Sequence, residues 1–123
     1  MSRAVAIVGA SRDHAKYGNK AVRAHRQIGD RVYPVHPKEK EIEGVPCVAS
    51  VLDLPDDVKS ISLITPPHVT EEVVELAVDK GIENIWIQSG AESRKAIETC
   101  LRNNINVIAE GNCILVVLGY LDH

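Results

Sequence analysis

The chain has 123 residues, of which 45% are apolar and 25% charged, and its formal net charge is -3. This length fits a single domain over residues 1–123 that can bury a core without disulfide staples. The acidic balance argues against a nucleic-acid surface, and no apolar run approaches the roughly 20 residues that span a membrane. The apolar start leaves no room for a signal peptide. Three cysteines at spacings that match no metal motif indicate a reduced, cytoplasmic protein.

Apolar runs and helical patterns alternate from the start of the chain. Residues 4–8 are nearly all apolar, which is typical of a strand covered on both faces. A helical pattern follows over residues 18–28, with Gly29 as its stop signal, and residues 31–36 predict a second strand. The inward positions of this helix are predicted to be Ala21, Val22, His25 and Ile28.

The stretch 38–57 is the least regular. Its residues 43–46 predict a turn, and residues 50–54 predict one helical turn. A third strand is expected over residues 60–65, where two prolines end it.

The second half of the chain repeats the alternation. Residues 69–80 predict a helix that Gly81 terminates, and residues 84–87 predict a fourth strand, in which Trp86 is structural. Residues 92–103 predict a helix that Asn104 ends as a left-handed cap, and residues 105–109 predict a fifth strand. This helix is expected to face inward with Ala96, Ile97, Cys100 and Leu101. The apolar segment 114–121 suggests a last short helix or an association surface, hence a homo-oligomer.

This alternation predicts an α/β fold: a Rossmann-like, doubly wound parallel sheet of five strands in the order 3-2-1-4-5. Helices on both faces make three layers. In such a sheet, ligands bind beyond the carboxyl ends of the strands, so the loops at that edge are the candidate site.

The first of these loops is suited to a pyrophosphate. Gly9 allows a tight turn, and Ala10 and Ser11 have small side chains that let backbone N–H groups approach an anion. The loop continues to Tyr17, and Arg12 and Lys16 are placed to reach phosphate oxygens. The spacing is not GxGxxG, because the next glycine is Gly18. The alternative is an ordinary turn with solvated charges.

The second loop carries the most information. A nicotinamide-binding domain usually has an acidic residue at the end of its second strand, which accepts hydrogen bonds from a ribose. Here that corner reads His36-Pro37-Lys38, which suits a phosphorylated ribose. A solvated Lys38 and a His36 that caps the strand are the alternatives.

The remaining loops are small or rigid. Thr65, Pro66 and Pro67 could form an apolar wall for an adenine, or could start a helix. Gln88, Ser89 and Gly90 follow the fourth strand, and Asn112 and Cys113 follow the fifth. Cys113 is either a packing residue or a reactive thiol at a helix N-terminus. Catalytic triads, paired carboxylates and metal clusters are absent from the pattern, so catalysis by this chain alone is not expected.

Five short motifs occur in order along nearly the whole chain: Val8-Gly9-Ala10-Ser11, Tyr33-Pro34-Val35-His36-Pro37-Lys38, Ile42-Glu43-Gly44-Val45-Pro46-Cys47, Ile85-Trp86-Ile87-Gln88-Ser89-Gly90 and Asn112-Cys113. With them the chain resembles the small, single-domain CoA-binding proteins, which are similar to the N-terminal domain of the succinyl-CoA synthetase alpha subunit. The resemblance implies a Rossmann-like fold that binds coenzyme A, or an acyl-CoA, through its phosphorylated ADP part.

By position, the resemblance places the pyrophosphate at residues 9–11, the 3′-phosphate at Lys38, and the adenosine beside residues 65–67. The pantetheine arm then runs toward residues 88–90. In the family the second strand usually ends in Asn-Pro where this chain has His36-Pro37. The catalytic histidine of the ligase lies in a following domain that is not part of this sequence, so ligase activity requires a partner subunit.

Three functions therefore remain open. The first is a non-catalytic CoA-binding module. The second is an NADP-dependent oxidoreductase, because a 2′-phosphate also suits Lys38. The third is a thiol-based redox protein in which Cys113 forms a mixed disulfide with CoA.

Overall fold

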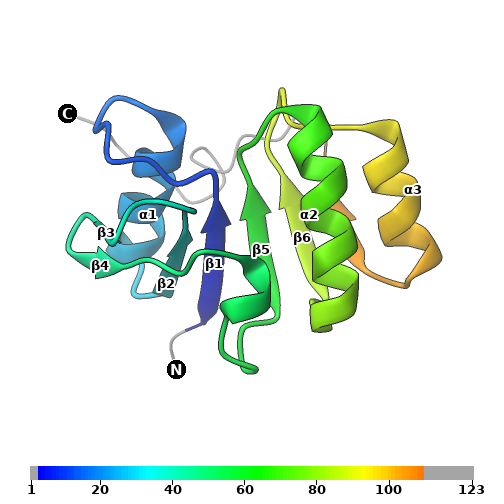
Figure 1. Cartoon of the computed structure of the whole chain (residues 1–123), viewed down its shortest axis with the longest axis horizontal. Coiled ribbons are helices and arrows are strands. Elements are labelled where there is room, and N and C mark those ends of the chain that lie inside the picture. The colour runs from blue at the N-terminus through cyan, green and yellow to red at the C-terminus, as the bar shows by residue number, and fades with distance from the viewer. Residues whose placement is uncertain (1–2, 110–123) are drawn as a thin grey trace.

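The computed structural model describes residues 3–109. It consists of eleven elements within these residues: β1 (Ala4–Val8), α1 (Tyr17–Gln27), β2 (Arg31–Val35), β3 (Glu41–Ile42), β4 (Val45–Pro46), the 3-10 turn η1 (Val51–Asp53), β5 (Ser60–Leu63), α2 (Pro67–Lys80), β6 (Asn84–Ile87), α3 (Arg94–Arg102) and β7 (Asn106–Ile108). Figure 1 shows the sheet with α2 and α3 on its near side. Within the described residues, no helix combines the length and the apolar character needed to cross a membrane.

Five strands form one parallel sheet in the order β2-β1-β5-β6-β7. An isolated parallel bridge between Val35 and Val48 adds a further chain segment outside β2. The predicted α/β fold with a five-stranded parallel sheet is confirmed. The Val48 segment outside β2 takes the place of the third strand in the 3-2-1-4-5 pattern, so the sheet matches that pattern with a different segment at its edge. The expected third strand is β5, which pairs with β1 instead of β2.

Both faces of the sheet carry a core, which makes three layers. On the face of α2 and α3, the side chains of Ile61, Leu63, Ile85 and Ile87 are fully buried. On the other face α1 packs its Ala21 and Val22 onto β1 and β2. Burial of these apolar surfaces is the main stabilising term of the fold.

The helix ends follow local signals. Gly81 adopts the left-handed conformation (φ 83°) after α2, as predicted, and Asn104 does so after α3 (φ 56°).

Two predicted inward positions are wrong: Ile28 is 50% exposed and Leu101 is 62% exposed. Ile28 follows the last residue of α1 and so leaves the helical spacing, and Leu101, next to the buried Cys100, lies outside the buried stripe of α3. In the irregular stretch, the turn is the residue pair Glu43–Gly44, whereas Val45 and Pro46 belong to β4.

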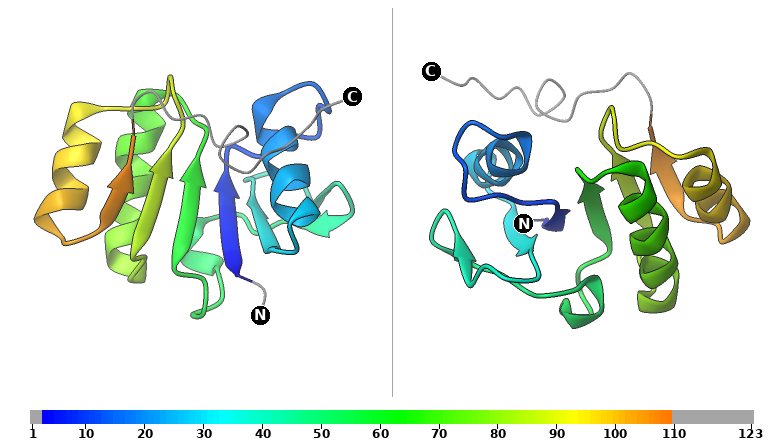
Figure 2. Two further views of the ribbon diagram at one scale, coloured as in Figure 1. Left: turned by 180° about the vertical axis from the view of Figure 1, so that it is seen from behind. Right: turned by 45° about the horizontal axis from the view of Figure 1, so that its top comes forward.

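α1 covers only half of its face of the sheet. The left panel of Figure 2 shows α1 beside β1 and β2, while no helix of the described chain stands in front of β5, β6 and β7. We call this uncovered surface the open half-face. Its side chains are Ser60, Ser62, Asn84, Trp86, Asn106 and Ile108.

The strand register brings the candidate loops to one edge. Val8 pairs with both Val35 and Leu63, and Leu63 pairs with Ile87. The four strands β1, β2, β5 and β6 therefore end at the same level, and the loops that follow them leave the sheet side by side.

Candidate functional site

Three hollows run along the carboxyl edge of the sheet, with volumes of about 590, 350 and 320 Å³. The first two share Gly9 and Ala10, the first and third share Ile64, and the second and third share Thr65. Because each hollow has lining residues in common with the others, the three lie side by side, and we call them together the edge cleft.

The first part of the edge cleft lies between the β1–α1 loop and the start of α1. It is lined by Gly9, Ala10, Ser11, Ala15, Lys16, Tyr17, Gly18 and Ile64. Gly9 has a φ of +93°, and a Cβ atom there would lie 2.0 Å from the carbonyl oxygen of Ile64. The predicted tight turn at Gly9 is thus required both by backbone conformation and by space.

Polar contacts within the loop and from α1 hold the loop in this shape. The side-chain amide of Asn19, which is fully buried, donates to the backbone oxygen of Ser11 at 3.0 Å. The Ser11 hydroxyl accepts from the backbone N–H of Asp13 at 3.0 Å, and the Asp13 carboxylate accepts from the backbone N–H of Ala15 at 3.0 Å. These contacts fix the loop without any ligand.

The N-terminus of α1 opens onto this hollow. Lys16 is its N-cap, no side chain caps it, and no acidic residue lies in its first turn. The positive end of the helix dipole therefore faces this hollow with no side-chain cap and no carboxylate in the first turn, which suits an anion. Arg12, by contrast, does not line the edge cleft: its guanidinium meets the carboxylate of Glu39 at 3.4 Å and is largely solvent-exposed. The ion pair ties the loops after β1 and β2 together.

The corner after β2 has an internal cap. His36 Nδ1 accepts hydrogen bonds from the backbone N–H groups of Lys38 and Glu39, both at 3.0 Å. The prediction that His36 caps the strand end is therefore confirmed. Lys38 is exposed, and within residues 3–109 its ammonium group forms no ion pair. The cap positions Lys38 at the rim, while His36 and Pro37 line the second hollow.

The second hollow is mainly apolar. Its walls include Val8, Val35, Val51, Val69, Val73 and Leu76, and Thr65 stands at its border. The Thr65 hydroxyl lies 2.6 Å from that of Thr70, which is fully buried and donates to the backbone oxygen of Pro66 at 3.3 Å. Pro67 is the first residue of α2, so the prediction that this segment starts a helix is confirmed. Its role as a wall for an adenine stays a prediction.

The third hollow lies between the ends of β5 and β6. It is lined by Ile64, Thr65, Pro66, Gln88, Ser89, Gly90 and Ala91. The backbone N–H of Gln88 donates to the oxygen of Leu63 at 3.0 Å, and that of Ala91 donates back to Gln88 at 2.9 Å. Gly90 has a φ of +96°, which this tight turn requires.

Most of the predicted site residues that the structure describes line the edge cleft. Arg12, Lys38 and Pro67 lie beside it, and Asn112, Cys113 and the segment 114–121 lie outside the described residues. Sequence reasoning missed Gly18, Asn19 and Thr70 as structural supports. Gly18 gave a signal, as a glycine at a helix start. Asn19 and Thr70 reach back from their helices to Ser11 and to Thr65 and Pro66, and no residue pattern marked these contacts in advance.

The described part of the chain offers little for redox or metal chemistry. No group of three metal-binding side chains occurs within residues 3–109. Burial raises the pKa of the Cys100 thiol, and burial together with Glu39 and Glu41 raises that of Cys47. Fewer thiolates at neutral pH make both groups less reactive.

The sequence matches the protein family described as "CoA binding domain" over residues 3–119. Among curated proteins, it is 32% identical to the acetate–CoA ligase [ADP-forming] of Methanocaldococcus jannaschii, over 98% of this chain and 18% of the ligase. It is 24% identical to the alpha subunit of acetate–CoA ligase [ADP-forming] II of Pyrococcus furiosus, over 91% of this chain and 27% of the subunit. The chain thus spans about a fifth to a quarter of these relatives.

Solved structures share the fold over nearly the whole chain. A conserved hypothetical protein from Pyrococcus furiosus superposes with a TM-score of 0.88 at 39% identity, covering 94% of this chain and 98% of that one. A dinucleotide-forming acetyl-coenzyme A synthetase from Ca. Korarchaeum cryptofilum, in complex with phosphate and ADP, gives a TM-score of 0.77 at 25% identity, covering 86% of this chain and 25% of that one.

Proposed function

The chain belongs to the CoA-binding domain family, and we propose that it binds coenzyme A, or an acyl-CoA, along the edge cleft as a non-catalytic module. The observation that carries this proposal is the row of three adjacent hollows beside a helix N-terminus that no side chain caps. CoA is long, with a phosphorylated nucleotide at one end and a flexible neutral arm at the other. An elongated cleft with one anion-binding part suits such a molecule.

Each part of the cleft has chemistry for one part of the ligand. The pyrophosphate would lie against Gly9, Ala10 and Ser11 at the N-terminus of α1, with Lys16 and Tyr17 beside it. The apolar second hollow would take the adenosine, bordered by Thr65 and the two prolines after it.

The 3′-phosphate would meet Lys38 at the corner that His36 caps, with Arg12 close by through its contact with Glu39. The pantetheine arm would run toward Gln88, Ser89 and Gly90, and onward to Asn112 and Cys113. The arm is uncharged, and none of the described residues that line the third hollow carries a charge.

The ligase activity of the full-length relatives is a different question from CoA binding by this chain. More than 70% of the length of these relatives lies outside the region that this chain matches, since the match covers 18% of one and 27% of the other. We propose that a CoA-dependent ligase reaction would require a partner subunit, and that this chain contributes the CoA site.

Calorimetric titration with CoA, dephospho-CoA and NADP tests the proposal. We expect CoA to bind most tightly. Loss of the 3′-phosphate should weaken binding about tenfold, because a charge-assisted hydrogen bond contributes about 1.5–3 kcal/mol and Lys38 is exposed. Tighter binding of NADP than of CoA would overturn the assignment in favour of a dinucleotide enzyme.

The variant Lys38→Ala locates the phosphate. It should weaken CoA about tenfold but leave dephospho-CoA unchanged, since the lost partner is absent from that ligand. Lys59→Ala is the matched control, because Lys59 precedes β5 at the opposite edge of the sheet. Equal effects of Lys38→Ala on both ligands would place the phosphate elsewhere. Native mass spectrometry of protein taken directly from cells would then identify the physiological ligand by its mass.

A further inference from the structure

The side chain of Asn19 is a fully buried junction between three parts of the chain. Its amide nitrogen donates to the backbone oxygen of Ser11 at 3.0 Å and to the carboxylate of Glu43 at 3.2 Å. Its amide oxygen accepts from the Nε of Arg23 at 2.8 Å. Both N–H groups and the oxygen of the amide are therefore engaged, and one residue joins the β1–α1 loop to α1 and to the β3–β4 hairpin.

Glu43 occupies a backbone position that its residue type disfavours. Ile42 pairs with Val45, which leaves a turn of two residues between the strands of the hairpin. Both turn residues have a positive φ, 52° at Glu43 and 74° at Gly44. A two-residue turn of this kind favours Asn-Gly, because asparagine adopts the left-handed conformation more readily than glutamate does. A strained residue that persists in a fold indicates a role for its side chain.

The backbone alone already holds this turn on α1. Arg26 donates to the backbone oxygen of Glu43 at 2.8 Å. The backbone N–H of Cys47 also donates to the oxygen of Lys40 at 2.9 Å, which closes the hairpin behind the turn. Since neither contact uses the carboxylate of Glu43, this group is left to act on Asn19 and, through it, on the loop.

The hydrogen bond from Asn19 to Ser11 also sets the direction of the next backbone N–H. The C=O and N–H groups of a trans peptide point in opposite directions, and no described peptide bond is cis. Because the oxygen of Ser11 is turned toward the buried Asn19, the N–H of Arg12 is turned away from it, out of the interior. Within residues 3–109 this N–H has no hydrogen-bond partner, so it is free to donate to an anion beside the loop.

We propose that Glu43 is a positioning residue for the anion site: through Asn19 it fixes the peptide group between Ser11 and Arg12, so that the Arg12 N–H donates to the pyrophosphate. This inference rests on the proposed function, because that function places a pyrophosphate in the first hollow. The carboxylate acts without touching the ligand. It accepts from one N–H of the Asn19 amide and so keeps the other N–H aimed at the oxygen of Ser11.

Two variants with the same charge test the reach of this side chain in the full-length chain. Glu43→Gln keeps the length and an acceptor oxygen for Asn19, whereas Glu43→Asn is one methylene shorter and loses that contact. Asparagine also suits the left-handed turn, so Glu43→Asn should fold with little change in the free energy of unfolding.

Calorimetry with inorganic pyrophosphate measures the effect on the site. Binding should be about fivefold weaker for Glu43→Asn than for Glu43→Gln, because one hydrogen bond no longer holds the loop. In NMR titrations, pyrophosphate should shift the backbone amide signal of Arg12 in the wild-type chain and in Glu43→Gln. At the same saturation, this shift should be smaller in Glu43→Asn.

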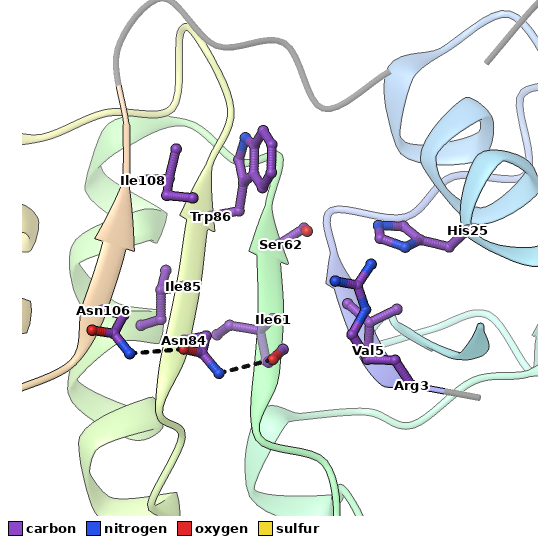
Figure 3. Close-up of a pocket in the computed structure, with 11 residues that line it drawn as sticks. Arg3, Val5, His25, Ile61, Ser62, Asn84, Ile85, Trp86, Asn106 and Ile108 are labelled. Atoms are coloured by element: carbon purple, nitrogen blue, oxygen red, sulfur yellow. Dashed lines mark hydrogen bonds between the residues drawn. The ribbon is translucent and has the colours of Figure 1, made fainter. Parts of the chain in front are cut away.

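Asn84→Ala is the control for the loss of a bridging polar side chain. Asn84 donates to Ser60 at 3.1 Å and accepts from Asn106 at 3.0 Å, so it too joins two neighbours. Figure 3 shows it on the open half-face, in a hollow of about 430 Å³ that His25 and Trp86 also line. Because this hollow and the first hollow of the edge cleft have no lining residue in common, Asn84→Ala should leave pyrophosphate affinity unchanged.

Equal binding of pyrophosphate by Glu43→Asn and Glu43→Gln would overturn the inference and leave the proposed function standing. So would an Arg12 amide signal that pyrophosphate does not shift in the wild-type chain. Failure of the proposed function has a different signature: the variants bind pyrophosphate in the expected order, but CoA binds no more tightly than pyrophosphate. A wild-type chain that binds neither ligand would overturn both.

Discussion

A Cβ atom on Gly18 would lie 2.0 Å from the backbone oxygen of Gly9. The two glycines sit at opposite ends of the β1–α1 loop, and their contact presses the start of α1 against the end of β1. In a dinucleotide-binding loop a nearby glycine serves this close packing of helix and strand. Here the same contact closes a loop of eight intervening residues, which explains why the pattern differs from GxGxxG while the loop remains compact.

The variant Gly18→Ala tests this contact. The added methyl group meets backbone atoms, so we expect a loss of about 3 kcal/mol in the free energy of unfolding, measured with urea. CoA affinity should fall as well, because the N-terminus of α1 shifts. Gly29→Ala is the control: its φ of +88° disfavours alanine, but no atom lies within 4 Å, so about 1 kcal/mol is expected. Similar losses in both variants would remove the special role of the Gly9–Gly18 contact.

The cap at His36 explains how this chain departs from the usual Asn-Pro of the family. In asparagine, Oδ1 is bonded to Cγ as Nδ1 is in histidine, so both side chains can accept from the N–H groups of residues 38 and 39. His36→Asn should therefore retain CoA affinity. His36→Ala should weaken it about fivefold, since loss of a cap typically costs about 1 kcal/mol. Calorimetry of both variants decides the matter, and equal weakening would show that the imidazole contacts the ligand itself.

Glu39 is the acidic group beside the proposed phosphate site. Its carboxylate pairs with Arg12 at 3.4 Å, so Glu39→Gln should free the guanidinium and remove a negative charge. We expect CoA to bind about twofold to fivefold more tightly at low salt, and the gain should shrink as salt screens the charges. Glu83→Gln removes the same charge before β6, at the far edge of the sheet, and should have no effect. A gain in both variants would point to net charge alone.

Acid should destabilise the fold through His25 and Asp30. Burial lowers the pKa of His25 in the folded protein, so the unfolded chain binds the proton first as the pH falls below about 6.5, the usual value of histidine. For Asp30, burial raises the pKa, but the hydrogen bonds from His25 and Arg3 outweigh it and the net pKa is lowered. Its contribution is present above the usual aspartate range and is lost as the pH falls through that range.

Urea unfolding at pH 7 and pH 5 measures the histidine part. The free energy of unfolding should be lower at pH 5, and His25→Phe should reduce this difference because it removes the buried titrating group. His68→Phe, at an exposed position in the first turn of α2, serves as the control. A pH difference that persists undiminished in His25→Phe would assign it to other groups.

Several features could be predicted because local rules determine them. Helix caps depend on one residue, so Gly81 and Asn104 were sufficient to place the ends of α2 and α3. The position of the candidate site followed from the parallel sheet, since every strand that leads into a helix ends at the same edge. Alternation of apolar and polar residues in β5 and β6 also signals a face without a helix, although the sequence analysis did not use it.

The sequence by itself therefore determined the alternation of strands and helices, their caps and the edge that carries the candidate site, because these depend on neighbouring residues. The tertiary structure alone decided that β5 pairs with β1, that Gly18 meets Gly9, and that the His25 and Trp86 side chains line one hollow. Each of these is a contact between residues far apart in the chain. Such contacts follow from how whole elements pack, and no local pattern records them.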